Sequence, residues 1–423
     1  MASRPSVRGA GALLLLLGLA ACDASFVDEA GLLAGRLPPG ALVVDRDSVG
    51  GPCDDARAPD EARSYATPWC SLDRALEAAP RGATVQVRRG AHPMLVASAS
   101  SGRSVELALS AAPLERVEIA GMSLENQSFL RFQGFAFTEA ILLLGGVANV
   151  HVTDCELTSS AAEAGVFAAA SVDGFSLERC TLHAAGRGVS MERGGSNLTF
   201  RGNLFLRLAG AGLRLADVEG VLIEGNELPD SDQPWFVVRS SDVVVRANRV
   251  HGARGPAWLH DVQRLVVENN VLTGFSLWAM SLANVPGARL VQNTIWANGK
   301  GGVELGDDAG APATTGVVVQ NNLLQTLDGP RALQAAFAFE DYNLVGSGFR
   351  TGAHDLAGAP LFVDSTVQDF HLAPASGGVD AALADGAPER DARGAPRVDD
   401  PRVPNTGSGS PPYGDLGALE GTP

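Results

Sequence analysis

The chain has 423 residues, of which 45% are apolar and only 6% aromatic, and it carries a formal net charge of −16 at neutral pH. This charge and the lack of a basic stripe argue against nucleic acid as a partner, because phosphate binding needs clustered Lys and Arg. Length alone allows two or three domains. The repeat described below favours one elongated body instead, which we expect to be a monomer.

The first 21 residues have the features of an export signal. Two arginines precede the apolar run 10–20, which is too short to span a bilayer, and small residues lead to Cys22. The sequence Leu-Ala-Ala-Cys that ends at Cys22 resembles the bacterial lipobox. This resemblance implies that Cys22 is lipidated and anchors the exported protein to the cell envelope, on the periplasmic side or at the cell surface. The alternative is an ordinary signal peptide in which Cys22 is incidental.

A cap is predicted before the main body of the chain. Residues 22–64 show no repeat and predict a tether with one short strand at 41–44. Apolar residues on one helical face then predict a helix over 71–79, with Ser71 as its N-cap. A strand at 84–87 follows. Such a helix covers the otherwise bare end of a stack of strands.

An eight-residue pattern recurs from about residue 130 to residue 324: apolar, any, apolar, any, any, Asn, any, apolar. The apolar residues alternate, as in strands, and a step of about 22 residues without helices indicates the turns of a parallel β-solenoid. At the polar position we expect an inward ladder of Asn residues. Each is predicted to take the left-handed backbone conformation at a corner and to bond its amide to the next. The ladder residues are Asn203, Asn226, Asn248, Asn270, Asn293 and Asn322.

This pattern resembles the right-handed parallel β-helix repeat of the pectate lyase-like superfamily. The resemblance covers roughly residues 66–345 and implies an all-β, single-stranded right-handed parallel β-helix with a short N-terminal capping helix. It says little about activity, because a fold does not carry its function with it. We divide the chain into a signal peptide (1–21), a tether and first strand (22–64), the β-helix (65–345), and a C-terminal cap with an irregular tail (346–423).

Four cysteines remain if Cys22 is lipidated, in a compartment where disulfides form. Cys53 and Cys70 flank the cap, and we expect a disulfide between them. Cys155 and Cys180 take the polar position of consecutive repeats, which places them about one strand spacing apart and within disulfide reach. The alternative for this second pair is two stacked free thiols. No spacing typical of a metal site accompanies the cysteines, and we expect no bound metal there.

Aromatic and charged side chains are predicted on the outer face of neighbouring turns. If Phe236 and Val238 face the core on one coil, and Ala257 and Leu259 on the next, four side chains point outward together: Trp235, Arg239, Trp258 and His260. Stacked aromatic rings with Arg between them suit sugar rings, particularly acidic ones. The alternative is that the Trp side chains are covered by loops.

The resemblance also implies two kinds of catalytic site. Relatives that cleave acidic polysaccharides use carboxylates that hold Ca²⁺ beside an Arg or Lys base, or paired carboxylates. A polygalacturonase-like set would begin Asn-Thr-Asp, but here Ile295 replaces the carboxylate after Asn293 and Thr294, and the later motifs are missing. We expect no cofactor, apart from Ca²⁺ if the protein is a lyase. The remaining catalytic candidates are Arg239, His260, Glu304 and Asp307.

We therefore expect a lipid-anchored β-helix protein of the cell envelope that binds polysaccharide or another surface polymer along its flank. The first alternative is a polysaccharide lyase or glycoside hydrolase of the same superfamily. The second is a non-catalytic structural spacer or adhesin.

Overall fold

The computed structural model describes residues 37–99, 102–159, 164–184, 186–306, 314–328, 337–348 and 350–421. The signal peptide, Cys22 and the start of the tether lie outside these ranges. In the described part of the chain, no helix is long and apolar enough to cross a membrane.

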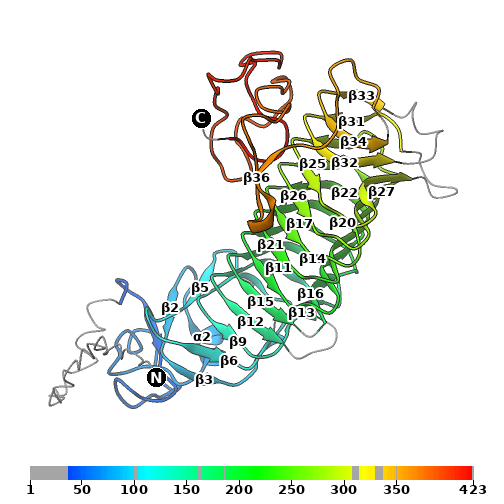
Figure 1. Cartoon of the computed structure of the whole chain (residues 1–423). Helices are drawn as coiled ribbons and strands as arrows, with labels where there is room; N and C mark the ends of the chain where they lie inside the picture. The colour runs from blue at the N-terminus through cyan, green and yellow to red at the C-terminus, as the bar shows by residue number, and fades with distance from the viewer. Residues whose placement is uncertain are drawn as a thin grey trace, which may run out of the picture.

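Short parallel strands wind into a right-handed solenoid, as the resemblance implied (Figure 1). Each full coil gives one strand to each of three sheets. Sheet 1 contains β4 (Leu95–Ala97), β7 (Met122–Glu125), β10 (Ile141–Gly145), β13 (Ala164–Ala168), β16 (Arg187–Met191), β19 (Ala211–Ala216), the first half of β22 (Gln233–Arg246), β24 (Ala257–Gln263), β27 (Trp278–Ala283), β30 (Gly301–Gly306) and the end of β32 (Leu323–Asp328).

The long strand β22 bends at Arg239, where φ is 48°, and continues into sheet 2. Sheet 2 contains β1 (Leu42–Val44), β2 (Thr84–Val87), β5 (Leu107–Ala111), β8 (Ser128–Gln133), β11 (Val147–Thr153), β14 (Val172–Glu178), β17 (Gly195–Arg201), β20 (Val218–Glu224), the second half of β22, β25 (Val266–Glu268), β28 (Arg289–Val291), β31 (Val317–Gln320) and β33 (Phe337–Asp341).

Sheet 3 closes each coil. It contains β3 (Gly90–His92), β6 (Val117–Ile119), β9 (Ala136–Phe137), β12 (Glu156–Ser159), β15 (Thr181–Ala184), β18 (Leu204–Leu206), β21 (Glu227–Pro229), β23 (Arg249–His251), β26 (Val271–Thr273), β29 (Thr294–Trp296), the start of β32, β34 (Leu344–Gly348) and β35 (Leu356–Ala357).

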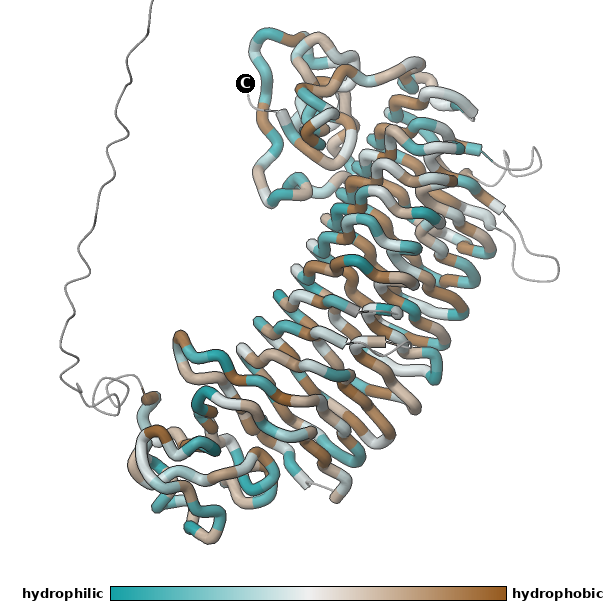
Figure 2. Tube along the Cα trace, turned by 60° about the horizontal axis from the view of Figure 1, so that its bottom comes forward, coloured by the Kyte–Doolittle hydropathy of each residue, from teal (hydrophilic) through white to brown (hydrophobic). Residues whose placement is uncertain are grey.

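The core lies inside the solenoid, and alternate residues of every strand fill it. In sheet 1, Leu215, Val237 and Leu259 stack in register on adjacent coils and are fully buried. Figure 2 shows the resulting alternation of hydrophobic and hydrophilic residues along the coils. Because strand side chains alternate between two faces, the residues between these positions are placed outside the solenoid.

The predicted Asn ladder is confirmed. From Asn203 to Asn322, each Nδ2 donates to Oδ1 of the next ladder residue at 2.9–3.0 Å, and all six side chains are buried. Asn343, which the repeat did not reveal, extends the ladder by one coil at 3.0 Å. The prediction of a left-handed backbone at the ladder residues is wrong. Positive φ falls on the preceding residue, as at Ala247 (54°) and Gln292 (58°), because the ladder residue itself leads into the next strand.

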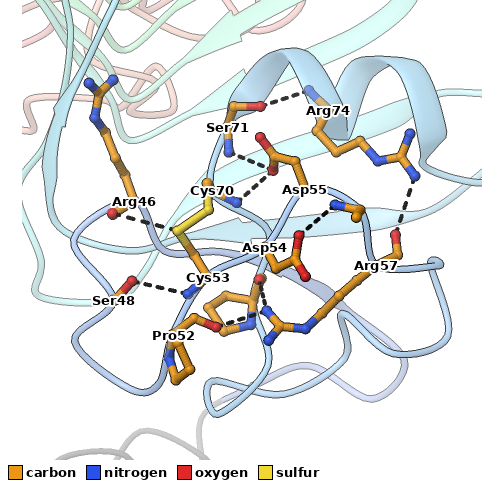
Figure 3. The surroundings of a disulfide bond; sticks show 12 residues. Arg46, Ser48, Pro52, Cys53, Asp54, Asp55, Arg57, Cys70, Ser71 and Arg74 are labelled. Atoms are coloured by element: carbon orange, nitrogen blue, oxygen red, sulfur yellow. Dashed lines mark hydrogen bonds between the residues drawn. A yellow bond between two sulfur atoms is a disulfide. The ribbon is translucent and has the colours of Figure 1, made fainter.

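The N-terminal cap forms as predicted. Helix α2 (Leu72–Ala78) begins after Ser71, whose hydroxyl accepts a hydrogen bond from the Arg74 amide at 3.1 Å. A disulfide joins Cys53 to Cys70, with their Cα atoms 4.9 Å apart (Figure 3). Oδ1 of Asp55 accepts from the Cys70 amide at 2.7 Å and the Ser71 amide at 3.1 Å. The disulfide and these bonds hold the loop before α2 against the helix start.

The second predicted disulfide is absent, because Cys155 and Cys180 are buried free thiols. The Sγ of Cys155 lies 3.1 Å from the carbonyl oxygen of Thr153, and the Sγ of Cys180 lies 3.3 Å from that of Glu178. Each thiol also reaches the preceding coil, Cys155 at 3.8 Å from the Phe132 carbonyl oxygen and Cys180 at 3.6 Å from that of Val152. The backbone amide of Cys155 also donates to the Cys180 Sγ at 3.4 Å, and that of Cys180 to Asn203 Oδ1 at 2.9 Å. The two thiols therefore continue the ladder in place of Asn.

The C-terminal segment packs on the outer face of sheet 3. It begins with an antiparallel pair, β36 (Phe362–Asp364) and β37 (Asp369–Leu372), joined by the 3₁₀ helix η2 (Ser365–Val367), and residues 373–421 follow as turns and loops. Leu323 and Leu344 of sheet 3 share a buried apolar cluster with Leu372 and Leu416. Figure 1 shows this segment, coloured orange and red, against the later coils. Sheet 3 is therefore covered along those coils.

Paired charges occupy the outer face of sheet 2. Glu224 accepts from Arg201 at 2.5 Å and from Arg246 at 2.6 Å, on the two neighbouring coils. Glu178 and Glu268 lie 3.8–3.9 Å from the same two arginines and lengthen the row. The charges alternate in register, so each of these two arginines lies between two carboxylates on neighbouring coils. Sheet 1 carries a different outer surface.

Candidate functional site

The candidate site is the outer face of sheet 1 from β16 to β32. Strand register places one outward residue of each coil in a single row along the solenoid. Its members are aromatic, hydroxyl-bearing or charged. They are Ser190, Arg214, Phe236, Trp258, Ser281, Glu304 and Asp328.

The middle of this row is held by side-chain contacts between coils. The guanidinium carbon of Arg214 lies 4.3 Å from the ring centroid of Phe236. Phe236 meets Trp258 edge to face with centroids 5.6 Å apart. Trp258 in turn lies 4.8 Å from the ring of His260, two residues further along β24. His260 Nε2 is 3.1 Å from the Ser281 hydroxyl on the next coil. The result is a continuous strip of rings and polar groups, which we call the aromatic strip (Arg214, Phe236, Trp258, His260 and Ser281).

Trp258 is the exposed ring of this strip, with 38% of its surface accessible. An indole held between two aromatic neighbours presents a flat apolar surface with little freedom to lose. Hydroxyl, imidazole and guanidinium groups surround it. This combination suits a ligand that has both apolar ring faces and hydroxyl groups.

A groove of about 760 Å³ runs beside the strip, where sheet 1 turns into sheet 2. Asp217, Arg239, Asp261 and Asn284 line it from four successive coils, each at a corner position with φ between 48° and 59°. Arg239 donates to both carboxylate oxygens of Asp217, at 2.9 and 2.8 Å. Asn284 donates to Asp261 at 2.8 Å.

The electrostatics of the groove follow from these pairs. Hydrogen bonding and charge attraction to Asp217 raise the pKa of Arg239. The same hydrogen bond lowers the pKa of Asp217. Both groups are therefore charged at neutral pH, and Arg239 keeps its proton. An arginine held in this way can bind a ligand oxygen but does not serve as a base.

The structure brings together three of the four residues predicted to bind substrate. Trp258 and His260 lie on the strip, and Arg239 lies on the adjoining groove. Glu304 follows Ser281 on the same row. Asp307 falls outside the described residues.

The placement of Trp235 on the surface is wrong. Its side chain is fully buried and pairs in register with Leu213, and the register of the next coil, which pairs Phe236 with Trp258, sets it opposite Ala257. The small side chain of Ala257 leaves room for the indole inside the solenoid. Phe236 points outward instead, so the predicted phase of this strand is shifted by one residue.

Sequence reasoning missed Arg214, Phe236 and Ser281 as members of the strip. A signal was present, because Leu259 was placed in the core and a step of about 22 residues back from it reaches Val237. Because Val237 then faces the core, its neighbour Phe236 faces outward. The same step taken one more coil back places Arg214 on the outside as well.

Within the described ranges, no three His, Cys, Asp or Glu side chains gather in an arrangement that could hold a metal ion. Calcium binding, which belongs to the lyase alternative, stays a prediction.

Residues 139–322 match the family described as right handed beta helix region. No curated protein matches the sequence. Among solved structures, pectate lyase Pel9A is similar over 90% of this chain and 96% of its own, with 14% identity and a TM-score of 0.54. The A-module of the Azotobacter vinelandii mannuronan C-5 epimerase AlgE6 covers 75% of this chain and all of its own, at 16% identity and a TM-score of 0.48. XylC, solved with xylose, covers 75% and 86%, at 9% identity and a TM-score of 0.49.

The likeness to the pectate lyase shows a shared right-handed parallel β-helix fold. At 14% identity it shows the fold alone.

Proposed function

We propose that the protein binds a polysaccharide, or another surface polymer with sugar-like rings, along the outer face of sheet 1. The observation that carries this proposal is the aromatic strip, in which the exposed ring of Trp258 is flanked by Phe236 and His260. Sugar rings stack on such surfaces through their apolar faces, while nearby polar groups bond to their hydroxyls. A row that follows the solenoid axis suits an extended polymer rather than a compact molecule.

Cleavage of such a polymer is the second candidate function. The observation that favours it is the hydrogen bond between His260 and Ser281 beside the groove, because a positioned His serves as a general base in many hydrolases. Arg239 is a poor base for a lyase reaction, since its ion pair with Asp217 holds its proton. The described residues therefore supply more groups than binding requires, but fewer than cleavage requires.

We also propose that the protein is exported and anchored through a lipid on Cys22, with the solenoid facing the periplasm or the cell exterior. The residues 10–20 and the lipobox-like sequence support this proposal. Labelling of cells with a fatty-acid analogue tests it. We expect label on the wild-type chain and none on Cys22→Ala; equal labelling of both would exclude the anchor.

Polysaccharide binding is tested with the exported form that begins after residue 22. It is incubated with a panel of acidic, neutral and amino polysaccharides, with and without Ca²⁺, and both retention and new chain ends are measured. Retention without cleavage supports binding. New chain ends that disappear in His260→Ala would establish the enzyme instead. Failure to interact with every polymer would leave the structural spacer or adhesin.

A further inference from the structure

We infer that the bound polymer carries positively charged amino sugars rather than acidic sugars. This inference rests on the proposed function and adds the charge of the ligand to it. It reverses the expectation that arginines near the aromatic rings favour acidic sugars.

Among the described residues, carboxylates outnumber guanidinium groups on the aromatic strip, on the row that continues it and in the adjoining groove. The guanidinium groups are those of Arg187, Arg214 and Arg239. The carboxylates are those of Glu192, Asp217, Glu219, Asp261 and Glu304.

The arginines already have anionic partners. Arg214 Nε lies 2.8 Å from Glu192, and its guanidinium plane is also engaged by Phe236. Arg239 binds Asp217 at 2.8 Å. A uronate carboxylate on the polymer would have to compete with these protein carboxylates for each guanidinium group.

The other end of the row is acidic. Past Trp258, the in-register positions on successive coils are Ser281, Glu304 and Asp328. Asp328 is exposed and Glu304 is half-buried. When one ring of the polymer stacks on Trp258, another sugar would lie two coils further along, beside Glu304, where an ammonium group would be attracted to the carboxylate. A sugar carboxylate at the same place would be repelled.

The chain as a whole adds to this bias. Its net charge of −16 gives a negative long-range field. Acidic polymers are therefore disfavoured at distance as well as at contact. The local geometry and the overall charge of the protein both favour a positively charged ligand.

The test compares three hexasaccharides of equal length by calorimetric titration at low salt: β-1,4-linked glucosamine, its fully N-acetylated form, and a hexamer of galacturonic acid. We expect the glucosamine hexamer to bind about tenfold more tightly than the N-acetylated form, with a preference that shrinks as salt is added. The uronate hexamer should bind most weakly. Tightest binding of the uronate, or equal binding of all three, would overturn the inference while leaving polysaccharide binding intact. If none of the three binds, and no polymer of the panel does, the proposed function itself fails.

Glu304→Gln locates the charge effect. We expect this variant to lose about fivefold in affinity for the glucosamine hexamer and to bind the N-acetylated form as the wild type does. Glu227→Gln is the matched control, because Glu227 is an exposed carboxylate on sheet 3. Equal losses in both variants would show that only the net charge of the protein matters and would contradict a site at Glu304.

Discussion

The indole of Trp258 stands edge-on to the imidazole of His260, with ring centroids 4.8 Å apart and an interplanar angle of 69°. Both side chains leave β24 on the same face, two residues apart, so the strand itself fixes their spacing. Phe236 supports the indole from the previous coil. The regular stacking of coils thus holds an exposed aromatic ring in one position, which lowers the entropy lost when a ligand binds.

The buried Asn ladder should contribute strongly to stability. In Asn248→Ala, the Nδ2 donor to the Ile223 carbonyl at 2.8 Å is lost, and the amide of Asn226 loses its acceptor at 2.9 Å. Buried groups left without partners cost about 1–3 kcal/mol each, so we expect a loss of about 3 kcal/mol in the free energy of unfolding. Urea denaturation measures it. The exposed Asn405→Ala is the control, and equal midpoints for the two variants would contradict the structural role of the ladder.

A buried ion-pair cluster should stabilise the N-terminal cap. The fully buried side chain of Arg88 lies 2.9 Å from Glu115 and 3.8 Å from Asp45. Glu115→Ala leaves much of this charge unbalanced, and we expect a loss of about 3–5 kcal/mol. Glu118→Ala removes one of the two carboxylate partners of the exposed Arg116, which keeps Glu156, and should cost about 0–1 kcal/mol. Thermal unfolding of the two variants compares them; similar losses would refute the burial argument.

The C-terminal segment should be most stable in mild acid. Burial raises the pKa of Glu420 to about 7 and that of Asp415 to about 6, above the values of 4.5 and 3.8 for exposed groups. Between about pH 4 and pH 7 the folded segment therefore binds more protons than the unfolded chain. Its contribution to the free energy of unfolding falls as pH rises through this window. We expect Glu420→Gln to reduce this dependence in thermal unfolding at pH 4.5, 6 and 7.5. An unchanged pH dependence in the variant would contradict the assignment.

The cysteines should divide into one disulfide and two thiols. After unfolding without reductant, the exported form is expected to expose Cys155 and Cys180 to alkylation, while Cys53 and Cys70 stay protected. Peptide mapping reads this directly, and four protected cysteines would show a second disulfide.

Replacing Cys53 and Cys70 by Ser should lower the free energy of unfolding by about 3 kcal/mol, because the disulfide closes a loop with a sequence separation of 17.

The sequence predicted the solenoid, its capping helix and most of the ladder, because each coil repeats the same physical requirement. A buried position that faces the next coil needs a side chain that both donates and accepts hydrogen bonds, and Asn recurs there. Asn343 escaped detection because the inward position before it holds Glu340, paired with Val319 in register, where the pattern expects an apolar residue.

The site was less predictable. The run from Trp235 to Val238 is apolar throughout, so alternation alone cannot set its phase, and the choice placed Trp235 outside. The covering of sheet 3 was also beyond sequence patterns. It depends on single contacts of an irregular segment, such as the hydrogen bond from the Ala418 amide to the Thr294 hydroxyl at 2.9 Å.

The most direct test of the account is the affinity of Trp258→Ala for the best polysaccharide of the panel, measured by titration calorimetry. Phe339→Ala is the control, because Phe339 is similarly exposed, at 37%, but lies on sheet 2. Loss of the stacking surface is expected to weaken binding about tenfold or more in Trp258→Ala and to leave the control unchanged. Wild-type affinity in Trp258→Ala, with both variants folded, would show that the polymer does not bind along sheet 1.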